Sequence, residues 1–408
     1  MTVIDAHHRL NFPMTGPLAS RWPGAFFCRP AVLAAVLCSL FGSANARPAV
    51  IVTVDVESTE SLPLPQQIDP VCDGGVRCGL LQIAYLLEQR RLAGTFFLNV
   101  YEYKAWGEPT LRNIARQLHS RGHDVALHTH PQWAYDPQRH YMYDYTLDEQ
   151  TRIVADGVRL LREWTGLPVV AHRAGAYSAN QDSIVALARN GITLDASLFP
   201  GERHCRLNEL GLPVNFPGQI GGVTEIPVTV YERHERPAGL GHLLPPHVVL
   251  GKIDVNAMDD EHQAVAALRA VSAANLPFVV IFLHSFSFEN APGRVGGAPL
   301  ANERAMRIFQ ALLDEISAQQ VPVITARDVA DQHNVSADDG ASGKPSDRMP
   351  VPRAEIVVPT LKYAVRVLRS FSTGTRVAIG CTALLSTVAM LWWARRTGRK
   401  GHRSSART

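Results

Sequence analysis

Short apolar segments alternate with amphipathic ones from residue 49 onward, and this alternation restricts the fold more than any other feature of the chain. Because the apolar segments are short and rich in Val, Ile and Phe, we predict that they are strands. They lie at Ala49–Val54, Gly94–Val100, His123–His128, Val169–Ala171, Thr193–Ala196, Thr224–Val230, Phe278–Leu283 and Val321–Thr325. Strands that are apolar throughout indicate a parallel sheet with helices on both faces.

The segments between these strands have the apolar period of helices. We expect helices at Leu80–Arg91, Thr110–Ser120, Leu147–Trp164, Ser183–Arg189, Asp260–Ala274 and Glu303–Gln319. The third begins with a capping box formed by Thr146 and Glu149. Seven or eight strand–helix units over about 280 residues suit a barrel better than an open doubly wound sheet. We therefore predict an α/β fold, with the strands arranged as a (β/α)7–8 barrel.

The composition excludes two classes of protein. With 46% hydrophobic and 19% charged residues, the chain can bury a large core, which disordered chains cannot. The net charge is only +3, and no basic stripe with interleaved aromatic residues crosses the middle of the chain. Nucleic acid is therefore not an expected partner. The sequence leaves the oligomeric state open.

The N-terminal segment, residues 1–46, has the pattern of a secretory signal peptide. Arg21 and Arg29 precede the apolar run Ala31–Gly42, and a small–Asn–small site follows and ends at Ala46. A positive region, a short apolar region and small residues in this order predict export, with cleavage after residue 46. A buried core helix is the alternative, although it leaves the small residues unexplained. Met14 is an alternative start of translation.

The C-terminal segment has the pattern of a single membrane anchor. Val377–Trp393 is apolar and uncharged, and at 1.5 Å per residue it spans about 25 Å, near the short limit for a bilayer. We predict a linker with a juxtamembrane segment at 336–374, a transmembrane helix at 375–394 and a basic cytoplasmic tail at 395–408. A helix lying on the membrane surface is the alternative. The domain at 47–335 is then expected on the periplasmic or extracellular side of the inner membrane.

Two cysteines flank a turn-rich loop in what we expect to be an oxidising compartment. Cys72 and Cys78 are therefore predicted to form a local disulfide. A zinc site is the weaker alternative, because no second pair of thiols lies nearby in the sequence. Cys205 is expected to be a free thiol.

Two carboxylates follow the first predicted strand. Alternation along an extended chain points the side chains of Asp55 and Glu57 to the same side. Burying two neighbouring acids is unfavourable unless a cation or a proton compensates their charge. One acid can thus bind a metal while the other acts as a base. A pair of solvated loop acids is the alternative.

Two histidines end the third predicted strand. His128 and His130 are two residues apart, so an extended chain directs both imidazoles to one place. Imidazoles together with a carboxylate are a normal ligand set for zinc or a similar divalent ion that also holds water. We predict a metal site here, with two core histidines as the alternative. His123, at the other end of the strand, is expected to be structural.

Two further strand ends carry an arginine and a histidine. Arg173 follows a short predicted strand, where it can hold a carboxylate through two hydrogen bonds, and small residues follow it up to Tyr177. His284 closes the strand Phe278–Leu283 and can transfer a proton near neutral pH. Active sites of α/β barrels lie at the C-terminal ends of the strands, so we expect all these motifs to meet.

The order of these motifs resembles that of the polysaccharide deacetylase family, whose catalytic unit is the NodB homology domain of carbohydrate esterase family 4 proteins. The resemblance spans about residues 50 to 330 and implies the distorted barrel of that family. It also implies a divalent metal, with zinc as the expected ion. The resemblance implies that Asp55 is the general base and that Arg173 positions it. It implies likewise that His284 is the general acid and that Asp195 orients it. The implied metal ligands are Glu57, His128 and His130, and the residues implied to contact the substrate and the oxyanion are Ala176 and Tyr177.

The chain departs from the family pattern in two places. An Asp-Val-Glu sequence replaces the usual adjacent pair of aspartates, so the acidic ligand, Glu57, lies one position further on. The second histidine of the usual motif would stand at position 132, where this chain has Gln132, and the nearby His130 takes its place. His172 is a further candidate ligand.

The expected function is therefore metal-dependent removal of N-acetyl or O-acetyl groups from an envelope or extracellular polysaccharide. Two alternatives stay open. The same site can hydrolyse another carbon–nitrogen bond, or the chain can be a membrane-tethered carbohydrate-binding protein with a decayed site, as the departures at Val56 and Gln132 suggest. The joint presence of Asp55, Arg173 and His284 favours an enzyme, because binding alone needs no matched acid and base.

Overall fold

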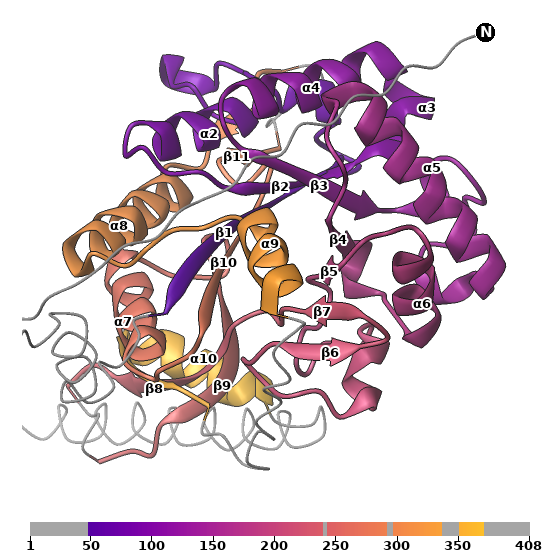
Figure 1. Ribbon diagram of the computed structural model, residues 1–408. Helices are drawn as coiled ribbons and strands as arrows, with labels where there is room; N and C mark the ends of the chain where they lie inside the picture. Colours follow the sequence, from indigo (N-terminus) through magenta and orange to yellow (C-terminus); the bar gives the residue numbers. More distant parts are fainter. Residues whose placement is uncertain (1–47, 240–242, 292–296, 337–350, 371–408) are drawn as a thin grey trace, which may run out of the picture. The chain divides into compact units, whose positions relative to one another are not determined.

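The computed structural model describes residues 48–239, 243–291, 297–336 and 351–370 (Figure 1). The predicted signal peptide and the predicted transmembrane helix lie outside these ranges. Within them, no helix has both the length and the apolar character needed to cross a bilayer.

The strands form one large sheet that is parallel over most of its width. It has 11 strands, in the order β13 (Arg353–Val358), β8 (Val230–Pro237), β9 (His247–Asp254), β10 (Phe278–His284), β1 (Ala49–Val56), β2 (Thr95–Asn99), β3 (Asp124–Thr129), β4 (Ala171–Ala174), β5 (Leu194–Asp195), β7 (Val223–Glu225) and β6 (Gly218–Ile220). From β9 to β7 every pairing is parallel, while β8 with β9 and β6 with β7 are antiparallel. The predicted α/β fold with a mostly parallel sheet is confirmed.

The strand order follows the chain as it does in a barrel. β10, the last strand of the parallel part, pairs with β1, the first. Among the described residues the hydrogen-bonded ladder is open between β7 and β9, and its edges are β13 and β6. The predicted strand at 321–325 is only a single bridge from Val323 to Val50. Pro322 explains this difference, because proline has no N–H to donate to a ladder.

Helices cover the outer face of the sheet (Figure 1). They are α2 (Leu80–Glu88), α3 (Tyr103–Trp106), α4 (Glu108–Ser120), α5 (Leu147–Thr165), α6 (Gln181–Arg189), α7 (Glu261–Ser272) and α8 (Glu303–Gln319), whereas α9 (Ala326–Ser336) packs at one end of the inner face. The predicted capping box of α5 is present: Thr146 N donates to Glu149 Oε2 at 2.8 Å, and Glu149 N donates back to Thr146 Oγ1 at 3.4 Å. The alternation in the sequence therefore predicted seven of the strands and six of these helices close to their observed positions.

Side chains on the inner face of the sheet form a second, smaller core. Six strands and the residue that follows β7 each contribute a small or apolar side chain to it: Ile51, Phe97, Ala126, Ala171, Leu194, Val280 and, after β7, Ile226. One end of this core is closed by α9, whose first residues hydrogen-bond to Thr95 and Asp124 at the start of β2 and β3. Side chains two or four residues further along the same strands share this face. The inner face at the C-terminal ends of the strands is therefore where the predicted site residues should meet.

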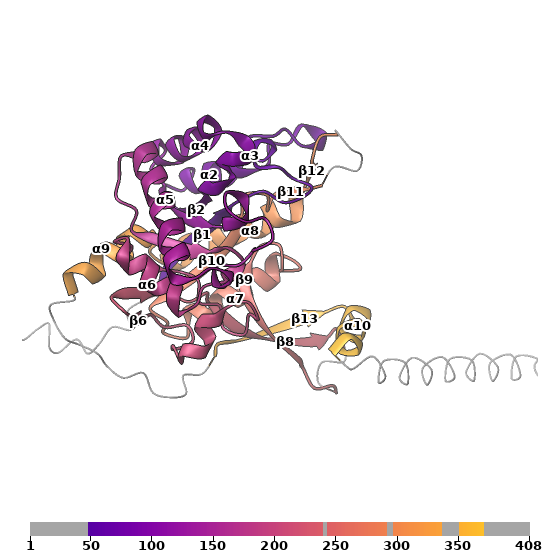
Figure 2. The same ribbon diagram turned by 90° about the vertical axis from the view of Figure 1, so that its right-hand side faces the viewer.

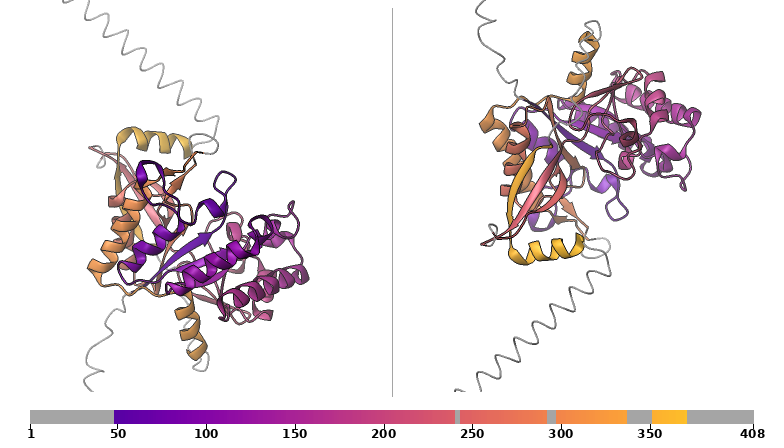
Figure 3. Two further views of the ribbon diagram at one scale, coloured as in Figure 1. Left: turned by 90° about the horizontal axis from the view of Figure 1, so that it is seen from above. Right: turned by 90° about the horizontal axis from the view of Figure 1, so that it is seen from below.

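The domain continues beyond residue 335, where a linker was predicted. Arg353–Val358 forms β13 along β8, and Thr360–Ser370 forms α10, on the side of the sheet opposite α9 (Figures 2 and 3). In α10, Arg366 pairs with Asp259 at 2.8 Å and also with Glu235. Every second residue of β13 is buried, which is the alternation that a strand with one covered face requires.

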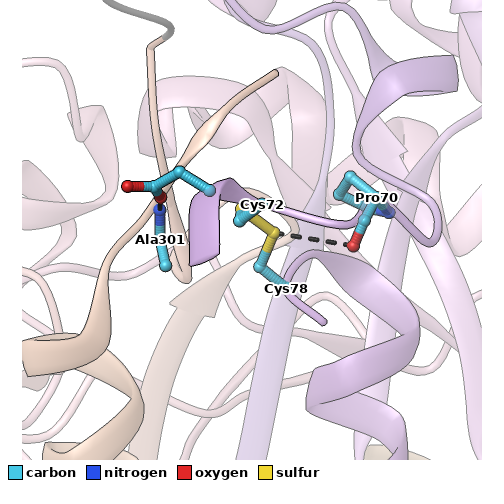
Figure 4. The surroundings of a disulfide bond; sticks show 5 residues. Pro70, Cys72, Cys78 and Ala301 are labelled. Atoms are coloured by element: carbon cyan, nitrogen blue, oxygen red, sulfur yellow. Dashed lines mark hydrogen bonds between the residues drawn. A yellow bond between two sulfur atoms is a disulfide. The ribbon is translucent and has the colours of Figure 1, made fainter. Parts of the chain in front are cut away.

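The predicted disulfide is present between Cys72 and Cys78 (Figure 4). The loop that it closes contacts the rest of the domain, because Ala301 N donates a hydrogen bond to Asp73 Oδ1 at 2.7 Å. Cys205 is a buried free thiol, as expected.

One buried acid outside the site has no compensating partner. Glu289 begins the short strand β11 (Glu289–Asn290), which pairs with β12 (Leu300–Ala301). Among the described residues, neither of its carboxylate oxygens has a hydrogen-bond partner. Burial raises the pKa of Glu289 from 4.5 to about 7. Because the folded-state pKa lies above the unfolded one, the free energy of unfolding should decrease as the pH rises from about 4.5 to about 7.

We therefore expect Glu289→Gln to stabilise the protein only at alkaline pH. At about pH 5 the free energy of unfolding should hardly change, whereas at about pH 8.5 it should rise by about 2 kcal/mol, a value reduced for solvent screening. Urea denaturation of the wild type and the variant at the two pH values measures both changes in the free energy of unfolding. Glu60→Gln, at an exposed position, is the matched control and should change neither. An equal gain at both pH values would contradict burial of a charge as the cause.

Candidate active site

Residues at the C-terminal ends of β1, β3, β4 and β10 meet on the inner face. Asp55 lies in register with His284 of β10, and His128 of β3 lies in register with Arg173 of β4. Glu57, just beyond β1, contacts His128 and reaches within 3.6 Å of His284 Nε2. The predicted meeting of these five residues is therefore what the structure shows.

Glu57, His128 and His130 form a group that can hold a metal ion. One ligand atom from each lies within 4.8 Å of the others. Glu57 Oε2 is 3.2 Å from His128 Nε2 and 2.5 Å from His130 Nε2. His128 Nδ1 donates a hydrogen bond to the backbone carbonyl of Arg173 at 2.9 Å. This bond places the proton on Nδ1 and leaves the lone pair of Nε2 directed at the group, as metal-binding histidines require.

His130 provides a test of whether the group suits a metal. Its Nε2 is buried and, despite its short distance to Glu57, has no hydrogen bond of acceptable geometry within the described chain. Gln132 Nε2 lies 3.3 Å from His130 Nδ1, and Gln132 Oε1 is buried without a partner. Turning this amide places Oε1 against Nδ1–H, which satisfies the oxygen and frees the lone pair of Nε2 for a cation. The donor set therefore fits a divalent metal ion.

The protonation of the group supports the same conclusion. Burial would raise the pKa of Glu57, but the charge of His130 and the close contact with His128 hold that pKa well below its usual value. Burial would lower the pKa of His128, but the charge of Asp55 and the contact with Glu57 raise it above its usual value. The carboxylate thus draws positive charge to this place, and a divalent ion supplies such charge without a proton.

Asp55 is held by Arg173. Arg173 Nη1 donates to Asp55 Oδ1 at 2.7 Å, and Arg173 Nε donates to the carbonyl of Ala196 at 3.0 Å. The guanidinium lies 4.3 Å from the ring centroid of Phe97 and is almost completely buried. Arg173 thus contacts the residue that it was predicted to position, although through one guanidinium nitrogen and not two. Asp55 Oδ2 faces the metal-binding group, 3.9 Å from His128 Nε2.

His284 lies between two aromatic rings at the end of β10. Its ring stacks on Phe286 at 4.6 Å between centroids and meets Phe282 edge-on at 4.7 Å. Burial lowers the pKa of His284, against the opposing charges of Glu57, Asp55 and Asp254. His284 is therefore placed beside the metal-binding group in a position from which it can exchange a proton.

Asp195 does not have the position that its predicted role requires. Its carboxylate accepts hydrogen bonds from His172 Nδ1 at 2.8 Å and from Ser197 Oγ at 2.7 Å. In register, Asp195 pairs with His172, so both side chains lie on the face of the sheet opposite to Arg173 and Asp55. His172 also contacts Thr129 Oγ1 at 3.0 Å and lies outside the metal-binding group. Asp195 thus connects β4 and β5 through its hydrogen bond with His172, on the outer face of the sheet, and does not orient His284.

Two polar residues of the site were missed from the sequence, and both lie on β9. Asp254 pairs in register with Phe282, two residues before His284. Lys252 Nζ lies 3.3 Å from Asp254 Oδ2, 3.3 Å from Tyr177 Oη and 3.4 Å above the Phe282 ring. Burial lowers the pKa of Lys252, against the charges of Asp254 and Asp55. The sequence does contain a signal for them: His247–Asp254 ends in an acidic residue shortly before a predicted helix, as the other site-bearing strands end in polar residues.

Ala176 and Tyr177 form a strained turn after β4. Both have positive φ, 51° and 56°, a left-handed conformation that costs about 1 kcal/mol or more for residues other than glycine. Ala176 is exposed, whereas the Tyr177 ring is buried against Phe199 and reaches Lys252. Such strain is found at ligand-binding turns, and the predicted assignment of this turn to the substrate is consistent with it.

The chain is similar in structure to solved polysaccharide deacetylases, the family that its motifs resemble. A Mycobacterium smegmatis protein named as a polysaccharide deacetylase matches with a TM-score of 0.48 and 15% identity, over 74% of this chain and 95% of that one. A family 4 carbohydrate esterase from Streptomyces lividans, solved with acetate, matches with a TM-score of 0.36 and 11% identity, over 68% and 91%. A CE4 family pseudoenzyme from Bacillus anthracis matches with a TM-score of 0.39 and 11% identity, over 71% of this chain and 67% of that one. No family model and no curated protein matches the sequence.

Proposed function

We propose that this protein is a metal-dependent hydrolase that removes acetyl groups from a polysaccharide. The observation that carries the proposal is the position of Asp55, which faces the group of Glu57, His128 and His130 while Arg173 holds it from behind. A carboxylate base, a metal-binding group and a second proton carrier are the parts that hydrolysis of an acyl bond needs. That the acyl group is an acetyl group and that it is carried by a sugar are inferred from the motifs, which resemble those of the polysaccharide deacetylase family.

Zinc is the ion that we propose for the metal-binding group, because two imidazoles and one carboxylate leave a position for water. When bound, such an ion supplies a Lewis acid for the acyl carbonyl and for water. Asp55 Oδ1 is occupied by the hydrogen bond from Arg173, so Oδ2 is the atom that takes the proton from the attacking water. The buried guanidinium keeps the carboxylate in this orientation.

The remaining steps need a proton donor and stabilisation of negative charge. His284 donates a proton to the departing nitrogen, and the low pKa that burial imposes makes its protonated form a stronger acid. The backbone of the turn at Ala176 is the proposed donor to the oxyanion. Lys252 adds a positive charge within reach of Asp55 and His284, which favours an anionic transition state in a partly desolvated site.

We further propose that the protein is exported and held at the inner membrane. The proposal rests on the patterns at 1–46 and 375–394 and on the basic tail at 395–408. The Cys72–Cys78 disulfide supports it, since disulfides persist in oxidising compartments. The substrate would then be an N-acetylated polysaccharide met close to the bilayer.

Acetate release from N-acetylated glycans by the full-length protein tests the function. We expect release that a chelator abolishes and added zinc restores, with about one metal ion bound per chain. Bound metal without acetate release would replace the acetyl group by another amide or acyl substrate. Neither metal nor acetate would overturn the proposal in favour of a carbohydrate-binding protein with a decayed site.

A further inference from the structure

Two tryptophans lie beside the loops that carry the candidate metal ligands. Trp133 is three residues after His130 and ends the short helix Pro131–Trp133. Trp106 ends α3, which follows β2, the strand between β1 and β3. The two rings are 6.3 Å apart between centroids, at 49° to each other, and both are partly exposed. By contrast, Trp164, which belongs to the core, is only 2% exposed.

The polar edge of Trp106 is turned toward the protein. Its Nε1 donates to Glu102 Oε2 at 2.9 Å and lies 3.0 Å from Ser58 Oγ. Ser58 directly follows the candidate ligand Glu57. Because the indole N–H is satisfied on the inner side, the part of the ring left at the surface is carbon. An apolar, rigid face is therefore presented next to a polar site.

A buried carboxylate connects this tryptophan to both ligand-bearing loops. Glu102 is fully buried, accepts hydrogen bonds from Ser58 N at 2.8 Å and Asn99 Nδ2 at 3.0 Å, and also contacts Ser58 Oγ. Asn99 Oδ1 in turn accepts from His130 N at 3.3 Å. The position of the Trp106 ring is thus coupled to the backbone of Ser58, next to the candidate ligand Glu57, and to the backbone of the candidate ligand His130. Packing alone would not need a buried acid here, which is unfavourable unless it is hydrogen-bonded.

We propose that Trp106 and Trp133 form a platform for a sugar ring adjacent to the one that is deacetylated, so that the substrate is a chain of at least two sugars. The inference rests on the proposed function. A pyranose ring has apolar C–H faces and a rim of hydroxyl groups, so it matches an aromatic surface beside polar loops. The fixed position of the pair relative to His130 would set which sugar of the chain reaches Asp55.

Binding of oligosaccharides to the full-length protein tests this platform independently of catalysis. The probes are N-acetylglucosamine oligomers and glucose oligomers of one to five sugars, titrated by calorimetry. We expect affinity to rise with chain length for the wild type, and Trp133→Ala to lower affinity for the longer oligomers about tenfold, with a much smaller effect on the single sugar. Trp133→Phe should keep most of the affinity, whereas Trp133→Leu, which retains apolar volume without a ring, should behave like Trp133→Ala.

Two measurements separate the possible failures. Tyr85→Ala removes an exposed aromatic residue on α2 and should leave the length dependence unchanged. Bound metal and thermal unfolding of the Trp133 variants show whether they fold. Equal affinity of wild type and Trp133→Leu for the longer oligomers, or no length dependence in the wild type, would overturn the platform. If the wild type bound longer oligomers more tightly but released no acetate, the platform would be supported and the proposed hydrolase activity would be contradicted.

Discussion

Replacing Asp55 by Asn should lower kcat for acetate release by about 10³-fold while the protein keeps its metal. The amide oxygen can still accept the hydrogen bond from Arg173 Nη1, so the side chain should stay in place. The amide cannot take a proton from water, however, and that is the role proposed for Oδ2. Rates of acetate release at saturating substrate, together with metal content, measure the two halves of this expectation.

Stability must be separated from catalysis in this variant, because Arg173 loses the charge that compensates it. Removing one partner of a buried ion pair can cost about 3–5 kcal/mol. Asp124→Asn is a matched control: Asp124 is also buried and pairs with an arginine, Arg327 at 3.0 Å, but at the opposite end of the strands. It should lower stability to a similar degree and leave kcat near the wild-type value. Full activity in Asp55→Asn would show that another group is the base.

The meeting of the site residues could be predicted because it depends only on strand polarity and on alternation. Parallel strands bring their C-terminal ends to one edge, and residues two apart share a face. Asp55 with Glu57, and His128 with His130, are pairs of this kind. No knowledge of strand pairing was needed to expect either pair on one side, and the structure places both pairs together.

The role predicted for Asp195 requires the inner face of the sheet, whereas its side chain lies on the opposite face. β5 has only two residues, so the sequence pattern does not say which of them faces inward. A shift of one residue reverses the face of every side chain in a strand. The pairing of Asp195 with His172 fixes the face, and that pairing is a contact between neighbouring strands that no local pattern contains.

β9 and β13 were missed for a related reason. β9 contains Gly251 and Lys252, and only the last two of its eight residues are buried, so it lacks the continuous apolar run used to find the other strands. β13 pairs with β8 across more than a hundred residues of sequence. Its alternation, with Ala354, Ile356 and Val358 buried, is visible only once the neighbouring strand is known.

Gly175→Ala should lower metal affinity by about 10²-fold with little loss of stability. A Cβ atom at this position would lie 2.4 Å from both Cε1 and Nε2 of His130, which is far inside contact distance. Since Gly175 has no left-handed backbone conformation, alanine fits the local chain, and the expected effect acts through the His130 ring. Competition with a chromogenic zinc chelator measures the affinity.

Gly166→Ala is the contrasting variant. Gly166 ends α5 with φ of 78°, and a Cβ atom there would meet nothing within 4 Å. Alanine at this position should cost about 1 kcal/mol of stability through its left-handed conformation and leave metal affinity unchanged. The two glycine variants thus separate displacement of His130 from general destabilisation. If Gly175→Ala bound zinc as tightly as the wild type, His130 would not be a ligand, and the third protein donor would have to come from elsewhere on the inner face, where His284 is the next histidine, 3.6 Å from Glu57.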